Sequence, residues 1–179
     1  MRKSGVEDSP KSLDRRLDLE LRGRGRHTLY RRLCLGVLAL IVVAALLNVF
    51  GQEVTSTVAE GPGAELRVSA PPRLRGGLLF QARFEIEAKR RLAKPKLVLS
   101  KGWLEGMTLN TVAPTPSSEN SGEDGLEMEF EELPAGGKLI VWTDWQVNPT
   151  DVGRRSEDVT LLDGSTRIAT AHRTVTVFP

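Results

Sequence analysis

Hydrophobic positions follow three different patterns along the 179 residues of the chain. Residues 1–32 are polar and densely charged, and residues 33–50 are apolar with no charge at all. From residue 65 onward, short runs alternate apolar with polar residues. A continuous apolar run is typical of a membrane-spanning helix, and a period of two is typical of half-buried strands. The pattern therefore predicts a polar tail, one transmembrane helix and a β domain.

The apolar run LCLGVLALIVVAALLNVF occupies residues 33–50. At ~1.5 Å per residue, a helix of this length nearly crosses the ~30 Å hydrocarbon core of a bilayer. A core helix of a globular protein is the alternative, but such a helix usually keeps a polar stripe for solvent, and this run has none. We therefore predict a transmembrane helix over 33–50.

Charge is distributed unevenly around this helix. Residues 1–32 hold ten Lys/Arg and five Asp/Glu, and the rest of the chain holds fifteen and eighteen. Next to the helix lies a basic patch, which we expect to anchor on anionic lipid and which consists of Arg22, Arg24, Arg26, Arg31 and Arg32. The sequence after the helix, GQEVTSTVAEGPGAE, contains no Lys or Arg. The positive-inside rule then places the N-terminus in the cytoplasm and the C-terminal domain outside, which predicts a single-pass membrane protein. The exported part lacks an Asn-x-Ser/Thr glycosylation acceptor, since Asn148 is followed by Pro149, and this fits a bacterial plasma membrane.

The expected organisation is a cytoplasmic tail (1–32), the helix (33–50), a linker (51–64) and an exported domain (65–179). A cleaved signal peptide is the alternative to an uncleaved anchor, with TVA at 57–59 as a cleavage site, but the charged lead is long for a signal peptide. Within the tail, leucines recur every fourth residue over 10–22 and Gly23 follows, which indicates a short amphipathic helix. A docking helix and a disordered tail both remain open for this segment. The position of the basic patch beside a membrane helix argues against a nucleic-acid partner.

Eight short strands are expected in the exported domain, separated by turns rich in Pro, Gly and Ser. They cover 65–70, 78–88, 96–100, 107–112, 125–133, 138–147, 158–163 and 166–178. Asp163 and Gly164 form a strong hairpin signal between the last two. Strands of this length and number predict the all-β class: an Ig-like antiparallel β-sandwich preceded by one transmembrane α-helix. Cys34 is the single cysteine, so the sandwich must hold together without a disulfide.

Three glutamates alternate along GLEMEFEEL, at positions 127, 129 and 131. Period two places them opposite Leu126, Met128 and Phe130, so we interpret the row as the solvated face of a strand. A carboxylate-dependent hydrolase is an alternative use of the row, and the nearby acids Glu119, Glu123 and Asp124 raise calcium as another. Neither has the expected motif, and His172 is expected on a strand face away from any nucleophile. We predict no catalytic residue, no cofactor and no metal site.

The tryptophans suggest where the domain binds a partner. Trp145 shares a face with apolar residues and is expected in the core, and Trp103 is expected to plug one end of the sandwich. Trp142 points the opposite way together with Ile140, which gives that strand an apolar outer face. Two further charges, Arg154 and Arg155, follow a turn. We predict these four residues (Ile140, Trp142, Arg154 and Arg155) as a partner or ligand surface, although a loop covering Trp142 remains an alternative. The basic cluster between 89 and 96 is interpreted as a solvated loop.

The stretches FQARFEIEA, KPKLVLSKGWLEGMTLNTVAPTP and GLEMEFEELPAGGKLIVWTDWQVNP, in this order, resemble bacterial Ig-like extracytoplasmic domains. The resemblance covers roughly residues 65–179. The whole layout is similar to single-pass membrane proteins of actinobacterial type. The resemblance implies a β-sandwich with a binding or accessory role, and it transfers no catalytic residue.

These observations together predict a non-catalytic, membrane-anchored envelope protein. Its partners would be the lipid bilayer and another envelope component, with an accessory role to a membrane protein favoured. Binding of cell-wall carbohydrate through Trp142 is the first alternative, and the hydrolase is the second.

Overall fold

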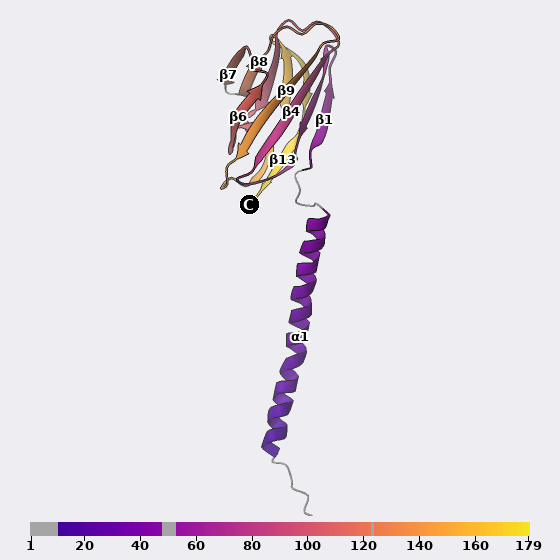
Figure 1. Cartoon of the computed structure of the whole chain (residues 1–179), viewed down its shortest axis with the longest axis vertical. Helices are drawn as coiled ribbons and strands as arrows, with labels where there is room; N and C mark the ends of the chain where they lie inside the picture. The colour runs from indigo at the N-terminus through magenta and orange to yellow at the C-terminus, as the bar shows by residue number, and fades with distance from the viewer. Residues whose placement is uncertain (1–10, 48–52, 123) are drawn as a thin grey trace, which may run out of the picture. The chain divides into compact units, whose positions relative to one another are not determined.

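The computed structural model describes the backbone of residues 11–47, 53–122 and 124–179, and the side chains of these residues from Thr28 onward. The chain divides into two units, residues 1–50 and 51–179, and Figure 1 shows one helix and one β domain. Asn48 to Phe50 of the predicted transmembrane segment lie outside the described residues.

The first unit contains helix α1, Lys11–Leu46. Residues Thr28–Leu46 are 19 residues of mean hydropathy 2.1, and none of them is buried within the described structure. This segment has the length and composition of a membrane anchor or of a signal sequence. The expected helix end at Gly23 is wrong, because α1 continues through Gly23 and Gly25. Glycine weakens a helix but keeps its N–H donor, so it does not break the hydrogen-bond ladder.

The second unit is an Ig-like β-sandwich, as the alternating pattern predicts (Figure 1). One five-stranded sheet has the order β1-β2-β4-β9-β6, and the other has the order β12-β11-β5-β8-β7. A smaller sheet has the order β10-β13-β3. Neighbouring strands are antiparallel except β13 and β3, which are parallel. The strands are β1 Thr55–Glu60, β2 Ala64–Ala70, β3 Arg73–Arg75, β4 Leu79–Ala88, β5 Pro95–Ser100, β6 Met107–Ala113, β7 Ser118–Gly122, β8 Gly125–Glu129, β9 Lys138–Val147, β10 Gly153–Ser156, β11 Val159–Asp163, β12 Thr166–Ala171 and β13 Thr174–Phe178.

Two expectations about local structure are corrected. The stretch 51–64, expected as a linker, contains β1, which pairs with β2 along its whole length. Its residues are small and mostly exposed, so no apolar alternation signals the strand, and backbone pairing with β2 holds it. The last expected strand, 166–178, is two strands: β12 ends at Ala171, and β13 joins the smaller sheet. His172 therefore lies in the turn between them and not on a strand face.

The hairpin expected at Asp163–Gly164 is confirmed. β11 and β12 pair on either side of it, and Gly164 adopts φ +62°. A non-glycine residue rarely adopts this left-handed conformation, which explains the glycine at this position.

An aromatic cluster fills the core between the sheets. Trp103, in the 3-10 turn Lys101–Trp103, lies 5.4 Å from Phe84 and 5.4 Å from Trp145 between ring centroids. Trp145 and Trp103 are fully buried, as expected for the former. The Trp145 indole N–H donates to the Thr143 hydroxyl at 2.7 Å, so this buried N–H group has a hydrogen-bond partner inside the core. Leu74, Val175 and Val177 of the smaller sheet belong to the same core.

Replacing Trp103 by alanine removes the ring that contacts both Phe84 and Trp145. We expect Trp103→Ala to lower the free energy of unfolding by about 3–5 kcal/mol, as truncation of a buried aromatic side chain does. Trp142→Ala, at an exposed position, is the matched control and should change it by less than about 1 kcal/mol. Urea unfolding followed by circular dichroism measures both, and equal effects of the two variants would contradict this description of the core.

Candidate functional site

Trp142 lies on the outer face of the larger sheet that contains β4 and β9. The register across four strands aligns Ser69, Arg83, Trp142 and Ala113 in one row, and strand alternation points all four away from the core. Trp142 is 41% exposed, which is unusual for an indole on a central strand. No loop in the described residues covers this ring completely.

Arg83 holds one side of the indole. Its guanidinium carbon lies 5.3 Å from the centroid of the Trp142 ring, within cation–π range. The same guanidinium forms a 2.6 Å ion pair with Glu85, and Glu85 also pairs with Lys138. The hydrogen bond from Lys138, together with the charge of Arg83, holds the pKa of the Glu85 carboxyl below its usual range. These contacts restrict the Arg83 side chain, and with it the orientation of the Trp142 ring.

A hollow of about 540 Å³ extends from Trp142 toward the start of β1. We call it the Trp142 hollow, and its lining includes Val54, Ser56, Leu79, Gln81, Arg83 and Trp142. The next row of the sheet is polar. Asp144 accepts hydrogen bonds from Gln81 at 3.1 Å and from the Thr111 hydroxyl at 2.7 Å. The hollow thus combines exposed apolar side chains with amide, hydroxyl and guanidinium groups, a mixture that suits binding of another molecule.

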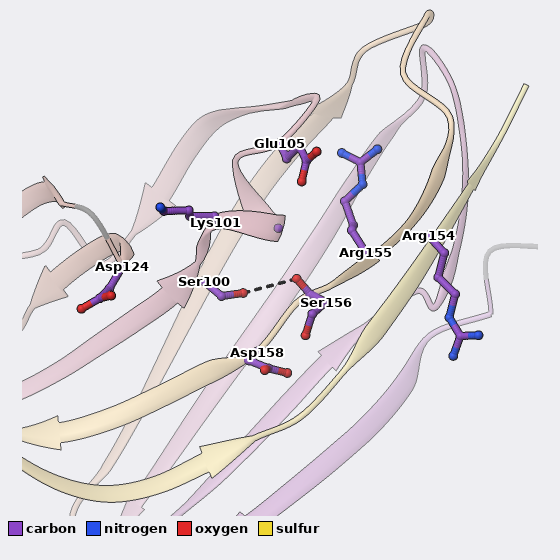
Figure 2. Close-up of a pocket in the computed structure, with 9 residues that line it drawn as sticks. Ser100, Lys101, Glu105, Asp124, Arg154, Arg155, Ser156 and Asp158 are labelled. Carbon is purple, nitrogen blue, oxygen red and sulfur yellow. Dashed lines mark hydrogen bonds between the residues drawn. The ribbon is translucent and has the colours of Figure 1, made fainter.

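Arg154 and Arg155 lie in a different part of the domain. Both are on β10 of the smaller sheet and line a second open hollow, together with Ser100, Lys101, Glu105 and Asp158. Figure 2 shows their guanidinium groups pointing apart, as consecutive residues of a strand do. The Arg155 side chain is only 7% exposed and pairs with Asp151 at 3.0 Å, whereas Arg154 is exposed.

The predicted four-residue surface is therefore not one surface. Ile140 and Trp142 share the outer face of β9, with Ile140 half-buried. Arg154 is on another sheet, and Arg155 is largely enclosed. Consecutive sequence positions suggested two charges presented together, but strand alternation separates them.

The membrane-side basic patch is described only in part. Arg31 and Arg32 are exposed residues of α1, just inside the apolar segment Thr28–Leu46. The side chains of Arg22, Arg24 and Arg26 lie outside the described residues.

The glutamate row is partly screened by a cation. Glu127 and Glu129 belong to β8 and are half-buried, and Glu131 follows the strand and is exposed. Lys96 pairs with Glu127 at 3.0 Å across β5 and β8. Within the part of the chain that the structure describes, no group of three His, Cys, Asp or Glu side chains is arranged to hold a metal ion. Glu123, one of the acids considered for calcium, lies outside the described residues.

The basic cluster between 89 and 96 pairs with surface carboxylates. Lys89 contacts Glu60 at 3.4 Å, and Arg91 contacts Glu132 at 2.6 Å. The hydrogen bond from Arg91 lowers the pKa of the Glu132 carboxyl. These pairs are exposed and contribute little to stability.

Sequence reasoning missed a buried ionisable pair, Glu157 and Arg173. Arg173 is 6% exposed and donates to the carbonyl oxygens of Val68, at 3.3 Å, and Ala70, at 2.7 Å. Glu157 is 0% exposed, and neither carboxylate oxygen has a hydrogen-bond partner in the described structure. Both residues sit in short connections between sheets that the one-dimensional pattern shows only as polar loops. No sequence signal distinguishes them from solvated charges.

Burial raises the pKa of Glu157 to about 7, because an ionised carboxylate loses its hydration there. The nearby positive charges of Arg173 and Arg155 oppose this increase. Burial in turn lowers the pKa of Arg173, and the charge of Glu157 opposes that decrease.

A raised carboxyl pKa in the folded state makes the protein less stable as pH rises. The folded protein retains the proton on Glu157 between pH 4.5 and about 7, while the unfolded chain has released it. The contribution of Glu157 to the free energy of unfolding is complete below pH 4.5. It falls by about 3 kcal/mol between pH 4.5 and about 7, and is constant at higher pH. We expect Glu157→Gln to remove this slope, with the variant gaining stability relative to the wild type at pH 8. Urea unfolding of both proteins at pH 5 and pH 8 measures the difference between their free energies of unfolding. An equal difference at the two pH values would contradict the raised pKa of Glu157.

Comparison with known proteins finds weak structural similarity at low sequence identity. No protein-family model matches the chain, and no curated protein matches its sequence. A CARDB domain of Pyrococcus furiosus, solved in complex with di-metal ions, is 12% identical, with a TM-score of 0.43 over 66% of this chain and 92% of that one. A non-cellulosomal cohesin from Archaeoglobus fulgidus is 13% identical, with a TM-score of 0.42 over 70% and 92%. CaCohA2 from Clostridium acetobutylicum is 14% identical, with a TM-score of 0.39 over 59% of this chain and 86% of that one.

Proposed function

We propose that this chain is a membrane-anchored, non-catalytic binding protein of the bacterial envelope. The helix Thr28–Leu46 is the anchor, the arginine-rich N-terminal side is cytoplasmic, and the β-sandwich is exported. The sandwich binds another envelope protein, most naturally an integral membrane protein that lies in the same bilayer. The Trp142 hollow is the binding surface.

The observation that carries this proposal is the exposed indole of Trp142 on a central strand. An apolar ring at such a position is normally avoided in an isolated domain, because it costs free energy in water. Here Arg83 holds the ring, and Val54 and Leu79, 57% and 64% exposed, extend the apolar surface. Large aromatic side chains beside arginine are the residues that contribute most to protein–protein binding energy.

Binding of cell-wall carbohydrate is the second candidate. Asp144, Gln81 and Thr111 form a hydrogen-bonded polar row directly beside the Trp142 ring. An aromatic face flanked by amide, carboxylate and hydroxyl groups suits a sugar ring as well as a protein side chain. A hydrolase that uses Glu129 is the third reading, and Glu129→Gln would abolish its activity.

In-cell crosslinking of the full-length protein, followed by purification in mild detergent, tests which of these applies. We expect one stoichiometric membrane protein to copurify with the wild type and to be lost, by at least about tenfold, with Trp142→Ala, since such aromatic truncations often cost 2 kcal/mol or more. Val58→Ala, an exposed apolar residue outside the hollow, is the matched control and should retain the partner.

Two outcomes would change the proposal. Copurification of glycan that depends on Trp142 would favour the carbohydrate candidate. A partner retained equally by Trp142→Ala and Val58→Ala would remove the hollow from the binding surface.

Membrane topology is tested separately by cysteine labelling in intact cells. In a Cys34→Ser background, Ser165→Cys at the exposed β11–β12 turn should react with a membrane-impermeant maleimide. Ser12→Cys in the N-terminal tail should react only after the membrane is permeabilised, because the positive-inside rule places it in the cytoplasm. The reverse labelling pattern would overturn the orientation.

A further inference from the structure

β6 is the outermost strand of the sheet that carries Trp142, and one of its two edges is unpaired. It pairs with β9 on one side and has no strand on the other. Figure 1 shows it at one margin of this sheet, with β1 at the opposite margin. Within the described residues, no backbone hydrogen bond reaches the outer side of β6. Such an edge presents a row of N–H and C=O groups that a further strand can bind.

The other outermost strands of the two large sheets differ from β6. β1 and β12 lie against each other along the opposite side of the sandwich, so each partly covers the edge of the other. β7 carries Glu119 and has no large apolar residue. β6 has no charged residue at all, and Thr108, Thr111 and Val112 are β-branched. Charged side chains on an edge strand discourage pairing with another chain, and β-branched residues favour it. Of these edges, β6 is therefore the one best suited to accept a strand.

The outward side of β6 brings this edge close to Trp142. Ala113 lies directly opposite Trp142 in the register of β6 and β9. A strand added beside β6 would have its backbone about 10 Å from that of β9, two strand spacings away. Because Ala113 has only a methyl group, a large side chain in the same row of the added strand can contact the indole above it. Trp142 thus borders its hollow on one side and the free edge on the other.

The inward side of β6 is apolar and only half covered. Leu109 and Val112 lie opposite the buried Trp145 and Thr143, and they pack on the core. Both remain half-buried, because no strand follows β6. Apolar side chains at such a margin lose their remaining contact with water when a further strand covers them, which is favourable. An apolar residue of the added strand would complete the core here.

We propose that the protein partner of the Trp142 hollow binds through an extended segment that adds a strand to β6. Main-chain hydrogen bonds to β6 hold the segment, and its side chains determine which segment fits. The row of Ala113 and Trp142 takes a large apolar side chain, and the row of Thr111 and Asp144 takes a polar one two residues away. The position between them, opposite Val112, takes an apolar side chain. The inference rests on the proposed protein-binding function, and it names the form of the partner: an extended segment without charges, since β6 offers none in return.

A second copy of this chain is a less suitable occupant of the edge. The register of β6 shifts between Leu109 and Thr111, which leaves Asn110 as an extra residue at the middle of the strand. If two β6 strands paired along their whole length about a twofold axis, the two irregular points would meet at the centre of the shared ladder. The hydrogen bonds there would be interrupted in both strands at once. A regular strand from another protein brings only one interruption.

Amide hydrogen exchange tests the added strand directly. The full-length protein is measured alone, purified in mild detergent from a heterologous host, and in the complex obtained by copurification with its membrane partner. We expect the outward-facing amides of β6, roughly half of those in Met107–Ala113, to exchange at least about tenfold more slowly in the complex. The amides of β7, at the edge of the other sheet, are the internal control and should exchange equally in both samples.

Three outcomes would overturn the added strand. If a partner copurifies through Trp142 and exchange at β6 is unchanged, the partner binds by side chains alone; the strand addition is then wrong and the proposed function stands. If exchange at β6 slows in the protein alone as its concentration rises, a second copy occupies the edge. If no protein partner copurifies with the wild type, the proposed function fails and the strand addition fails with it.

A charge placed on the free edge provides a second test. Ala113→Lys puts an ammonium group in the row that the large apolar side chain of the partner would occupy, and we expect recovery of the partner to fall by at least about tenfold. Ser118→Lys, on the exposed edge strand β7, is the matched control and should retain the partner. Circular dichroism of both variants checks that the sandwich remains folded. Equal losses with the two variants would refute a specific role of β6.

Discussion

Packing of two sheets on one apolar core, without any covalent cross-link, is the constraint on which the rest of this domain depends. The chain has one cysteine, and it lies in the apolar helix, so nothing but burial and hydrogen bonding holds the sandwich. Trp103 and Trp145 fill the space between the sheets and contact Phe84 and Phe80, respectively. Rings of this size bury the most apolar area per residue, which is what a disulfide-free sandwich of this length needs. With inward positions committed to packing, any binding chemistry must lie on outward faces.

The outward faces differ from one another, and this difference is the basis of the functional reading. One sheet exposes Trp142 beside paired charges and a hydrogen-bonded polar row. On the sheet that carries the glutamates, Lys96 forms an ion pair with Glu127 and offsets its charge. The smaller sheet presents Arg73, Arg75 and Arg154 on its exposed face. A single domain thus presents an aromatic surface and an arginine-bearing surface on different sheets.

Period-two alternation predicted the all-β class and most of the strands, because strands such as β4 and β9 bury every second residue. It missed β1, β3, β7 and β10, which are short or have few apolar residues and are held by backbone pairing with neighbours. It placed Trp145 in the core and Trp142 outside correctly. It could not separate Arg154 from Arg155, since their opposite orientations depend on β10 being a strand. The burial of Glu157 and Arg173 could not be predicted from the sequence either. It depends on how the two connections that contain them pack in the folded domain, and not on the neighbouring residues in the sequence.

Arg173 and β13 connect the two ends of the domain's sequence. Arg173 donates to the carbonyls of Val68 and Ala70, more than a hundred positions earlier, and β13 pairs in parallel with β3 near the beginning of the domain. Contacts of such long sequence separation slow folding, because the intervening loop must close before they form. During synthesis the N-terminal strands of the sandwich emerge first, yet the smaller sheet cannot assemble until β13, Thr174–Phe178, is free. Until that moment the core residues of β2 and β4 lack their β13 neighbours, so the interval between the emergence of β2 and that of β13 is the period in which the nascent domain most needs protection from aggregation.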